Sequence, residues 1–361
     1  MDPREYEVLA RIESKRRRRH VKVLDEHITL AHGAGGKSSH ALIEALFLRE
    51  LQNPLLEPLG DSAVFNAAAN IGPRLAFSTD SYVVRPRFFP GGDIGELAIY
   101  GTVNDLAMSG ARPVYLSVAL ILEEGLPVAE LEQVVRSIAV AATAAEILVI
   151  TGDTKVVERG KGDGIYINTS GVGIVEHGIE LSPSNIQPED QVIVSGSIGD
   201  HGMAIMVARG ELELEVDLRS DSAPLHGLVK ELLASVDGVR CLRDPTRGGV
   251  ATVLNELALA AEVGIVLDET TLPVRPEVNG ACELLGIDPL YVANEGKLIA
   301  IVAPEDADEA LAALRRHPLG ERAAIIGSVK PHPPGMVLLE TAFGGSRVVD
   351  MLAGDPLPRI C

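Results

Sequence analysis

Long hydrophobic runs are missing from this sequence, and cysteines are few. No apolar run reaches the roughly 18 residues that a membrane span requires, so we expect no transmembrane segment. Residues 1–20 carry charges where the apolar part of a secretory signal would lie, so no signal peptide is predicted. The three cysteines, Cys241, Cys282 and Cys361, form no C-x-x-C pair, which argues against a disulfide framework and a structural zinc site. We therefore expect a protein of the reducing cytoplasm.

Positive charge is also scarce. The 32 Lys and Arg residues are outnumbered by 51 Asp and Glu residues, which gives a formal net charge of −19. Such a charge repels nucleic acid. The basic run at residues 15–19 neither alternates with aromatic residues nor recurs elsewhere, so we interpret it as a solvated N-terminal extension. No nucleic-acid partner is expected.

Length and composition indicate a soluble protein of two domains. The chain has 361 residues, of which 46% are hydrophobic, with 36 Gly and 22 Pro. A Pro- and Ser-containing stretch at residues 181–188 is the predicted linker. Strands and helices do not alternate strictly along the chain, so a mixed α+β architecture fits better than a doubly wound parallel sheet.

The hydrophobic pattern predicts several individual elements. Alternation and apolar runs indicate strands, and amphipathic runs with capping residues indicate helices. We expect strands at 26–30, 113–122, 147–150 (ending in the segment 151–155), 191–196 and up to 302, and helices at 93–109, 127–145 and 252–261.

A glycine-rich segment at residues 33–36 precedes Lys37 and a predicted helix start at Ser38 or Ser39. Small residues let the backbone approach an anion closely, and a helix N-terminus favours a phosphate. A P-loop would require glycine at the position of Ala31, so the strict motif fails by one residue. A P-loop NTPase stays open as an alternative, although the α+β order argues against it.

Acidic residues follow at the ends of predicted strands and helices. Asp61, Asp80, Asp105 and Asp153 each stand at such a position. A single aspartate there is usually a cap or a turn residue. Together with the glycine-rich segment, however, these carboxylates are what Mg²⁺ and a triphosphate require.

The chain stops on Cys361, after a segment rich in Gly and Pro. Extended at about 3.3 Å per residue, the part beyond Phe343 reaches on the order of 60 Å, enough to enter its own active site, a neighbour's or a partner protein's. The α-carboxylate raises the pKa of the thiol and Arg359 lowers it, and on a solvated tail both effects are small. We therefore predict no strongly activated thiolate in the free tail.

Seven motifs resemble the HypE family of hydrogenase maturation factors, over residues 27–361. They are Ala31-His32-Gly33-Ala34-Gly35-Gly36, Gly60-Asp61-Ser62-Ala63, Thr79-Asp80-Ser81, Thr102-Val103-Asn104-Asp105-Leu106-Ala107, Gly152-Asp153-Thr154-Lys155, Arg243-Asp244-Pro245-Thr246-Arg247-Gly248-Gly249 and Pro358-Arg359-Ile360-Cys361. The resemblance implies the two-domain fold of PurM, the aminoimidazole ribonucleotide synthetase. In that fold an N-terminal α/β domain forms a barrel across a homodimer and is followed by a C-terminal α+β domain.

With this resemblance, the chain divides into an N-terminal extension (1–26), an ATP-binding and dimer-forming domain (27–178), a C-terminal domain (179–342) and a mobile tail (343–361). The implied activity is ATP-dependent dehydration of a carbamoyl group on the terminal cysteine to a thiocyanate. The implied partners are a HypF-type carbamoyltransferase, which delivers the carbamoyl group, and a HypC–HypD complex, which accepts the cyanide for the iron of a [NiFe]-hydrogenase.

The resemblance also assigns residues. It implies catalytic roles for Cys361, Glu295 and Lys155, the last two handling the protons of the carboxamide. It implies Mg²⁺ ligands at Asp61, Asp80, Asp105 and Asp244. The implied ATP contacts are these four aspartates together with Gly35, Gly36, Lys37, Asn104, Asp153, Thr154 and Gly249.

Two other classes of function stay open at this point. Another ATP-using enzyme of the superfamily, a selenophosphate synthetase or a small-molecule kinase, would use the same aspartates. A selenophosphate synthetase, however, generally has Cys or selenocysteine near the glycine-rich loop, where this chain has neither. A non-enzymatic scaffold that delivers metal through its terminal cysteine would show no ATP turnover.

Overall fold

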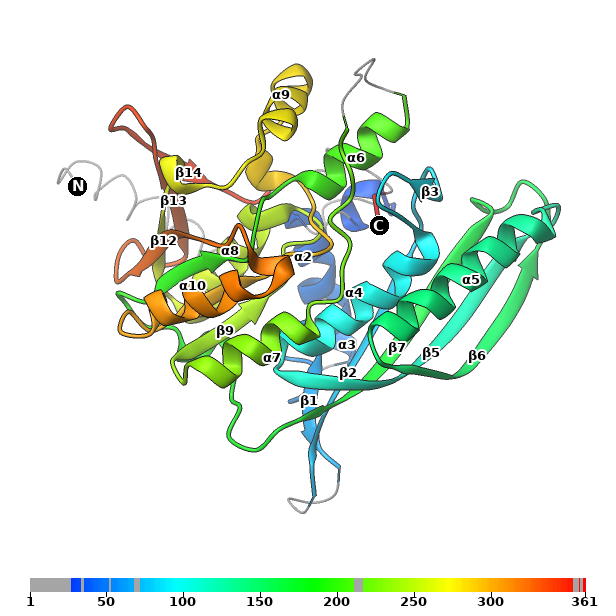
Figure 1. The fold of residues 1–361 in the computed structure, drawn as a ribbon, viewed down its shortest axis with the longest axis horizontal. Helices are drawn as coiled ribbons and strands as arrows, with labels where there is room; N and C mark the ends of the chain where they lie inside the picture. Colours follow the sequence, from blue (N-terminus) through cyan, green and yellow to red (C-terminus); the bar gives the residue numbers. More distant parts are fainter. Residues whose placement is uncertain are drawn as a thin grey trace.

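Two large β-sheets organise the protein. The computed structural model describes residues 27–33, 36–51, 53–67, 72–210, 217–352, 357, 360 and 361. The first sheet uses strands that end before residue 176, and the second uses strands that begin after residue 190 (Figure 1). Each sheet carries its own helices, which confirms the predicted α+β fold of two successive units.

The first sheet has the strand order β1-β2-β7-β5-β6, with β5 and β6 parallel and the other neighbours antiparallel. Two helices, α4 and α5, cover one face (Figure 1). Every second residue of β7 is therefore buried against them. The bounds are β1 Ala63–Asn66, β2 Arg74–Tyr82, β5 Ala111–Glu123, β6 Leu148–Val157, β7 Ile165–Val175, α4 Ile94–Met108 and α5 Val128–Ala144.

The opposite face of the first sheet carries apolar side chains that nothing covers among the described residues. Phe77, Tyr115 and Ile121 are 43%, 44% and 43% exposed there. The edge strand β6 adds Leu148, which is paired in register with Tyr115 and is 64% exposed. We call this surface the open face. An apolar surface of this kind is typical of a protein interface.

Helix α4 is buried on nearly all sides because it lies between the first sheet and the second unit (Figure 1). The Asp93 side chain caps its start by accepting the N–H groups of Gly95 and Glu96 at 2.7 and 3.1 Å. The helix gives way to Gly110, whose φ of +73° favours glycine. Its buried polar residues therefore lie at the junction of the two units.

The second sheet has seven strands in the order β14-β13-β10-β12-β8-β11-β9. Side chains of β11 alternate between its two faces: Ile299 and Ile301 pack with α8, whereas Ala300 and Val302 pack with α7 and α10. The bounds are β8 Gln191–Val194, β9 Val239–Arg243, β10 Gly264–Asp268, β11 Ile299–Val302, β12 Ala324–Lys330, β13 Met336–Glu340, β14 Ser346–Val349, α7 His226–Ser235, α8 Gly249–Ala261 and α10 Ala307–Arg316.

Shorter elements complete the described structure. None of the described helices is long and apolar enough to cross a membrane. The short elements are η1 Leu30–Gly33, α2 Lys37–Leu42, the π-helical η2 Ile43–Leu48, α3 Arg49–Leu51, β3 Phe88–Phe89, β4 Gly92–Asp93, η3 Pro183–Asn185, α6 Asp200–Ala208, η4 Glu269–Thr271, α9 Pro276–Leu285, η5 Pro289–Tyr291 and η6 Pro318–Gly320.

Most elements expected from the sequence are confirmed, and one expectation is wrong. Residues 27–30 form no strand, and the Thr29 N–H instead bonds to the His32 ring at 3.0 Å within a 3-10 turn. The strand expected from residue 147, ending in the segment 151–155, forms as β6 and continues to Val157. Gly152 lies inside this strand because the Val118 carbonyl of β5 approaches it so closely that the Cβ of any other residue would not fit.

The C-terminal segment, predicted as a mobile tail from residue 343, begins with β14 and returns to the first unit. The Leu352 carbonyl accepts the Lys37 N–H at 2.9 Å. Farther on, Leu357 and Ile360 are only 2% and 5% exposed and pack in the core cluster that also contains α4 and α6. The end of the chain therefore docks in the body of the protein.

Candidate active site

Four aspartates lie close together where the two units meet. Asp80 comes from β2, Asp105 from α4, Asp61 precedes β1 and Asp244 follows β9. The pKa of Asp105 is raised well above its usual value, first by burial and then by the charges of the other three. Burial and the charge of Asp61 raise the pKa of Asp244 to about 8. The fold therefore gathers the four carboxylates that the sequence singled out.

Arg243 is a basic residue bound to this cluster. Its guanidinium forms a salt bridge with Asp61 and lies 3.7 Å from Glu256. Burial raises the pKa of Asp61, and the charge of Arg243 opposes that rise. Ser78 adds a neutral contact, with its hydroxyl 2.6 Å from a carboxylate oxygen of Asp105. Part of the like-charge repulsion is thus offset within the protein.

Glu295 lies beside the cluster and is 4% exposed. Its Oε1 has no hydrogen-bond partner among the described residues. The pKa of Glu295 is raised well above its usual value, first by burial and then by the charges of Asp244, Asp221 and Asp80. A buried carboxyl with a raised pKa and a free oxygen is suited to accept a proton from a bound group.

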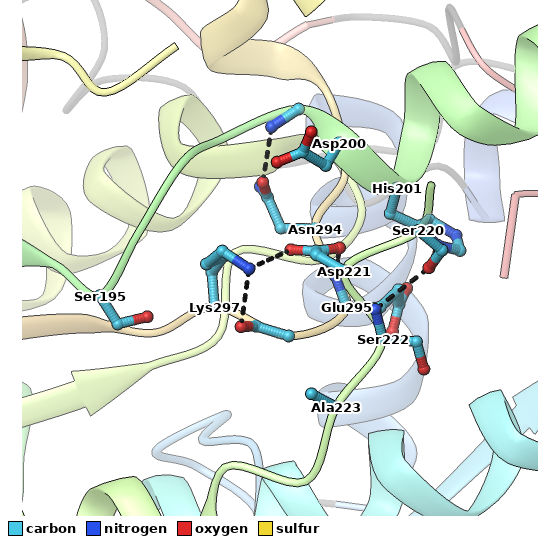
Figure 2. A network of polar contacts seen from close by, with 12 residues as sticks. Ser195, Asp200, His201, Ser220, Asp221, Ser222, Ala223, Asn294, Glu295 and Lys297 are labelled. Atoms are coloured by element: carbon cyan, nitrogen blue, oxygen red, sulfur yellow. Dashed lines mark hydrogen bonds and ion pairs between the residues drawn. The ribbon is translucent and has the colours of Figure 1, made fainter. Parts of the chain in front are cut away.

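The backbone around Glu295 is fixed by a buried polar network (Figure 2). Asp221 accepts the Glu295 N–H at 3.1 Å and pairs with Lys297 at 2.9 Å. From α4, the Asn104 amide donates to the carbonyls of Glu295 and Ala223 at 3.2 and 3.0 Å. The network ties α4 to the second unit and holds the Glu295 segment in one position.

The terminal thiol lies at the same place. The Sγ atom of Cys361 is 3.5 Å from Nη1 of Arg247, and the second Arg247 nitrogen is 3.8 Å from Asp80. The Val83 N–H donates to a terminal carboxylate oxygen of Cys361 at 3.3 Å. Burial raises the pKa of the thiol to about 12 despite the Arg247 charge. In the docked tail too, then, the sulfur is not an activated thiolate.

Of the predicted nucleotide-binding residues in the glycine-rich segment, the structure describes Gly36 and Lys37, and Lys37 does not pair with the aspartate cluster. Lys37 points to the C-terminal segment and pairs with Asp350 at 2.5 Å. Gly36 stands at the start of α2, and Gly35 falls outside the described residues. Lys37 therefore has an acidic partner of its own in this conformation and is not paired with the aspartate cluster.

Residues of β6 are not brought to the cluster within one chain. Lys155 is paired in register with Ile121 and Asp153 with Ala119, which places both on the open face. Asp80 lies on the helix-covered face with Ser78 and Tyr82. Three strand spacings, about 14 Å, also separate β6 from β2. Thr154 lies on the same exposed edge strand, on the helix-covered side.

Gly249 has a clear structural reason to be glycine. It opens α8 with a φ of +62°, and an added Cβ would lie 2.6 Å from the carbonyl oxygens of Leu290 and Val292. The close approach of these backbones allows Asn294 to donate to the Pro245 carbonyl at 2.9 Å. This glycine thereby helps to place Asp244 and Glu295 next to each other.

Several site residues escaped sequence reasoning. Asp221 and Lys297 belong to no recognisable motif and meet across 76 residues of sequence. The contact of His201 with the tail joins residues 159 positions apart, so no local pattern indicated it. Arg247 could have been recognised from the sequence, because it belongs to the Arg-Asp-Pro-Thr-Arg motif on which the family resemblance rests.

No ready-made metal site is present in the described part of the chain, where no three His, Cys, Asp or Glu side chains converge as ligands. The aspartates are near enough to raise one another's pKa values. Carboxylate oxygens are the donors that Mg²⁺ prefers. The donor set therefore fits a hard divalent cation.

Comparison with known proteins first defines the class. Residues 60–175 match the N-terminal domain of AIR synthase related proteins, and residues 187–338 match the C-terminal domain. These ranges correspond to the two units around the first and second sheets. The chain is thus a two-domain protein of the AIR synthase related class.

More similar relatives define the family. The chain is 52% identical to a protein described as carbamoyl dehydratase HypE from Cupriavidus necator, over 95% of this chain and 97% of that one. A crystal structure of the hydrogenase maturation protein HypE in complex with ATP is 50% identical, with a TM-score of 0.77 over 93% of this chain and all of that one. A structure of a HypE–HypF complex is 46% identical, with a TM-score of 0.81 over 86% of this chain and all of that one. The chain belongs to the HypE family of carbamoyl dehydratases.

Proposed function

We propose that this protein uses ATP to dehydrate a carbamoyl group on the sulfur of Cys361. The product is a thiocyanate, which supplies the cyanide ligands of the iron centre in a [NiFe]-hydrogenase. The observation that carries the proposal is the position of the terminal thiol, 3.5 Å from Arg247 and beside the buried Glu295 and Asp80. Carbamoyl dehydratases among its relatives and an ATP complex of one HypE support it.

The chemistry begins with a poor leaving group. Transfer of the γ-phosphoryl group from ATP to the carbamoyl oxygen releases ADP and converts that oxygen into part of a phosphate. The C–O bond then breaks, phosphate leaves, and the nitrogen loses two protons as the C≡N bond forms. In sum, carbamoyl and ATP give thiocyanate, ADP, phosphate and one proton. Positioned cations stabilise the charge on the transferred phosphoryl group.

Glu295 is the proposed general base for the nitrogen. Its buried carboxylate holds a proton more firmly than an exposed one, because burial and nearby aspartates raise its pKa. Arg247, already beside the sulfur, is placed to contact the group that the sulfur carries. Asp221 and Asn104 act on the backbone of Glu295 and keep its side chain directed to the site.

Asp61, Asp80, Asp105 and Asp244 are the proposed Mg²⁺ ligands. Bound Mg²⁺ would offset the negative charge of the triphosphate and of the phosphoryl group in transit. The nucleotide contacts would include these aspartates with Gly35, Gly36, Lys37, Asn104, Asp153, Thr154 and Gly249. For Lys37, this role requires that it leave Asp350.

A homodimer is the proposed assembly, with the open faces of two first sheets turned toward each other. Exposed Phe77, Tyr115 and Ile121 would be buried there. Lys155 lies on the open face, opposite the side of the sheet that carries its own Asp80. Because β6 is an edge strand, its Lys155 and Asp153 would reach past the edge of the neighbour's sheet and serve the neighbour's site.

The proposed partners are the protein that delivers the carbamoyl group to Cys361 and the complex that receives the cyanide made from it. A HypF-type carbamoyltransferase would load Cys361, in keeping with the HypE–HypF complex formed by a relative. A HypC–HypD complex would accept the cyanide. We propose that these steps take place in the cytoplasm.

The test is to incubate the protein carbamoylated on Cys361 with Mg-ATP and follow the mass of the C-terminal peptide. We expect it to lose the mass of one water. The loss should be absent in Asp80→Ala, and Cys361→Ala should not accept the carbamoyl group. An unchanged peptide mass alongside unconsumed ATP would refute the proposed activity and favour a metal-delivery scaffold.

A further inference from the structure

His201 joins the tail to the body of the protein. It lies on α6, is fully buried, and meets the ring of Phe89 edge-on with the ring centroids 5.7 Å apart. Its Nδ1 is 2.8 Å from the hydroxyl of Ser220. Figure 2 shows the two side chains next to each other. Its Nε2 is 2.6 Å from the carbonyl oxygen of Ile360, the residue before the terminal cysteine.

The direction of these hydrogen bonds can be worked out. A carbonyl oxygen only accepts, so Nε2 of His201 must carry a proton and donate it to Ile360. In the neutral ring, Nδ1 then accepts from the hydroxyl of Ser220. That hydroxyl oxygen in turn accepts the N–H of Ser222 at 3.1 Å. Each group has the role it needs, which fixes one neutral tautomer.

The three hydrogen bonds form a chain that runs from residues 220–222 to the tail. The same segment contains Asp221, which accepts the Glu295 N–H. The contact with Ile360 therefore links the docked tail to the loop that fixes Glu295. The Ile360 side chain, 5% exposed, is packed in the core beneath.

The contact also sets the position of the sulfur. The carbonyl of Ile360 belongs to the peptide group that leads into Cys361, so fixing it fixes the start of that residue. The Val83 N–H holds the other side of Cys361 at 3.3 Å. Between these two backbone contacts, the thiol is directed to Arg247. Loss of the His201 contact would release one end of the residue.

We propose that His201, oriented by Ser220, is the positioning residue that keeps the tail docked with Cys361 beside Glu295. The docked position is the one for dehydration, and here the inference rests on the proposed function. Loading of the sulfur by another protein requires the opposite, an undocked tail. The hydrogen bond to Ile360 then sets the balance between the two positions without touching the reacting atoms.

The reactivity of the Cys361 thiol measures this balance directly. Cys241 and Cys282 are 3% and 1% exposed, so they serve as internal references for global opening. Iodoacetamide labelling of the unmodified full chain, followed by peptide mass spectrometry, gives the rate at each cysteine. We expect His201→Ala to label Cys361 about three- to tenfold faster, the range that loss of one hydrogen bond implies.

Two variants separate positioning from packing. His201→Gln retains a donor nitrogen at the reach of Nε2, so labelling should return to within about twofold of the wild-type rate. Ser220→Ala keeps the ring but frees its tautomer, and an intermediate rate is expected. His317→Ala is the matched control, because the His317 ring accepts the Leu319 N–H at 3.2 Å and has no hydrogen bond to Leu357, Ile360 or Cys361, the described residues at the end of the tail.

Equal Cys361 labelling in His201→Ala and wild type would overturn the inference, as would His201→Gln labelling as fast as His201→Ala. If His201→Ala also exposes Cys241 and Cys282, Ser220→Ala decides: faster labelling confined to Cys361 supports the inference, and an unchanged rate refutes it. Labelling needs neither ATP nor a carbamoyl group. A failure of dehydration with these rate differences intact would therefore count against the proposed function alone.

Discussion

At the scale of single residues, Glu295 combines two properties that rarely occur together. Its carboxyl is buried with one oxygen that has no hydrogen-bond partner in the described part of the chain, and its backbone is held at both the N–H and the carbonyl. A structural carboxylate would ordinarily have its oxygens satisfied. The arrangement fits a group whose partner arrives with the substrate.

Replacing Glu295 with Gln tests this role. The substitution keeps the shape but removes the base, so dehydration should fall about 10²- to 10⁴-fold while ATP binding is kept. Since the base acts when deprotonated and its pKa is raised, the wild-type rate should increase with pH through that raised pKa. The residual rate of the variant should lack this rise. Single-turnover kinetics and nucleotide titration measure the two effects, and equal loss of both would make Glu295 structural.

At the scale of elements, the direction in which the side chains of β6 point decides whether they can reach the site of their own chain. Its Lys155 and Asp153 lie on the open face, whereas the aspartates of β2 and α4 lie on the helix side. A strand cannot present one residue to both faces of its sheet. Within one chain the two sets therefore lie on opposite faces, which is why we propose that Lys155 and Asp153 serve the site of a second chain.

A mixed-dimer experiment distinguishes the two arrangements. Lys155→Ala and Glu295→Gln chains should each be inactive alone. After exchange of subunits, a mixed dimer that shares residues across its interface regains one of its two sites, so a random mixture should recover about a quarter of wild-type activity. No recovery, in samples where mixed dimers are verified by mass, would place Lys155 in its own chain's site or outside catalysis.

The elements also show what the sequence could and could not predict. Asp93 and Gly110 correctly predicted the two ends of α4, because helix capping depends only on residues next to the helix end. The prediction of a strand at residues 26–30 was wrong because an alternation of apolar and polar residues forms a strand only where a partner strand is available. Asp221, Lys297 and His201 were missed because their roles depend on contacts with residues far away in the sequence. A local sequence pattern does not indicate such contacts.

At the scale of the whole molecule, the two units meet at a cluster of acidic residues. Asp61, Asp80 and Asp105 belong to the first unit and Asp244 to the second. Folding therefore brings negative charges together. The structure offsets them in part with Arg243 and relies on protonation for the rest.

This arrangement predicts how stability changes with pH in the protein without nucleotide. The pKa of Asp244 is about 8 in the folded state, above its usual value, so the folded state binds more protons than the unfolded state between about pH 4 and pH 8. The free energy of unfolding should therefore decrease as the pH rises through that range. In Asp244→Asn the decrease should be smaller. Urea titrations across the range measure it, and parallel curves for both proteins would contradict the assignment.

The open face of the first sheet also has a consequence for the amount of protein a cell must make. If each site is completed by the neighbouring chain, a lone chain has no complete site. At low abundance, activity would then grow with the square of the protein's concentration, and above the dimer dissociation constant it would grow in proportion. A cell that makes the protein sparingly would have almost no maturation, so expression level would act as a threshold for producing active hydrogenase.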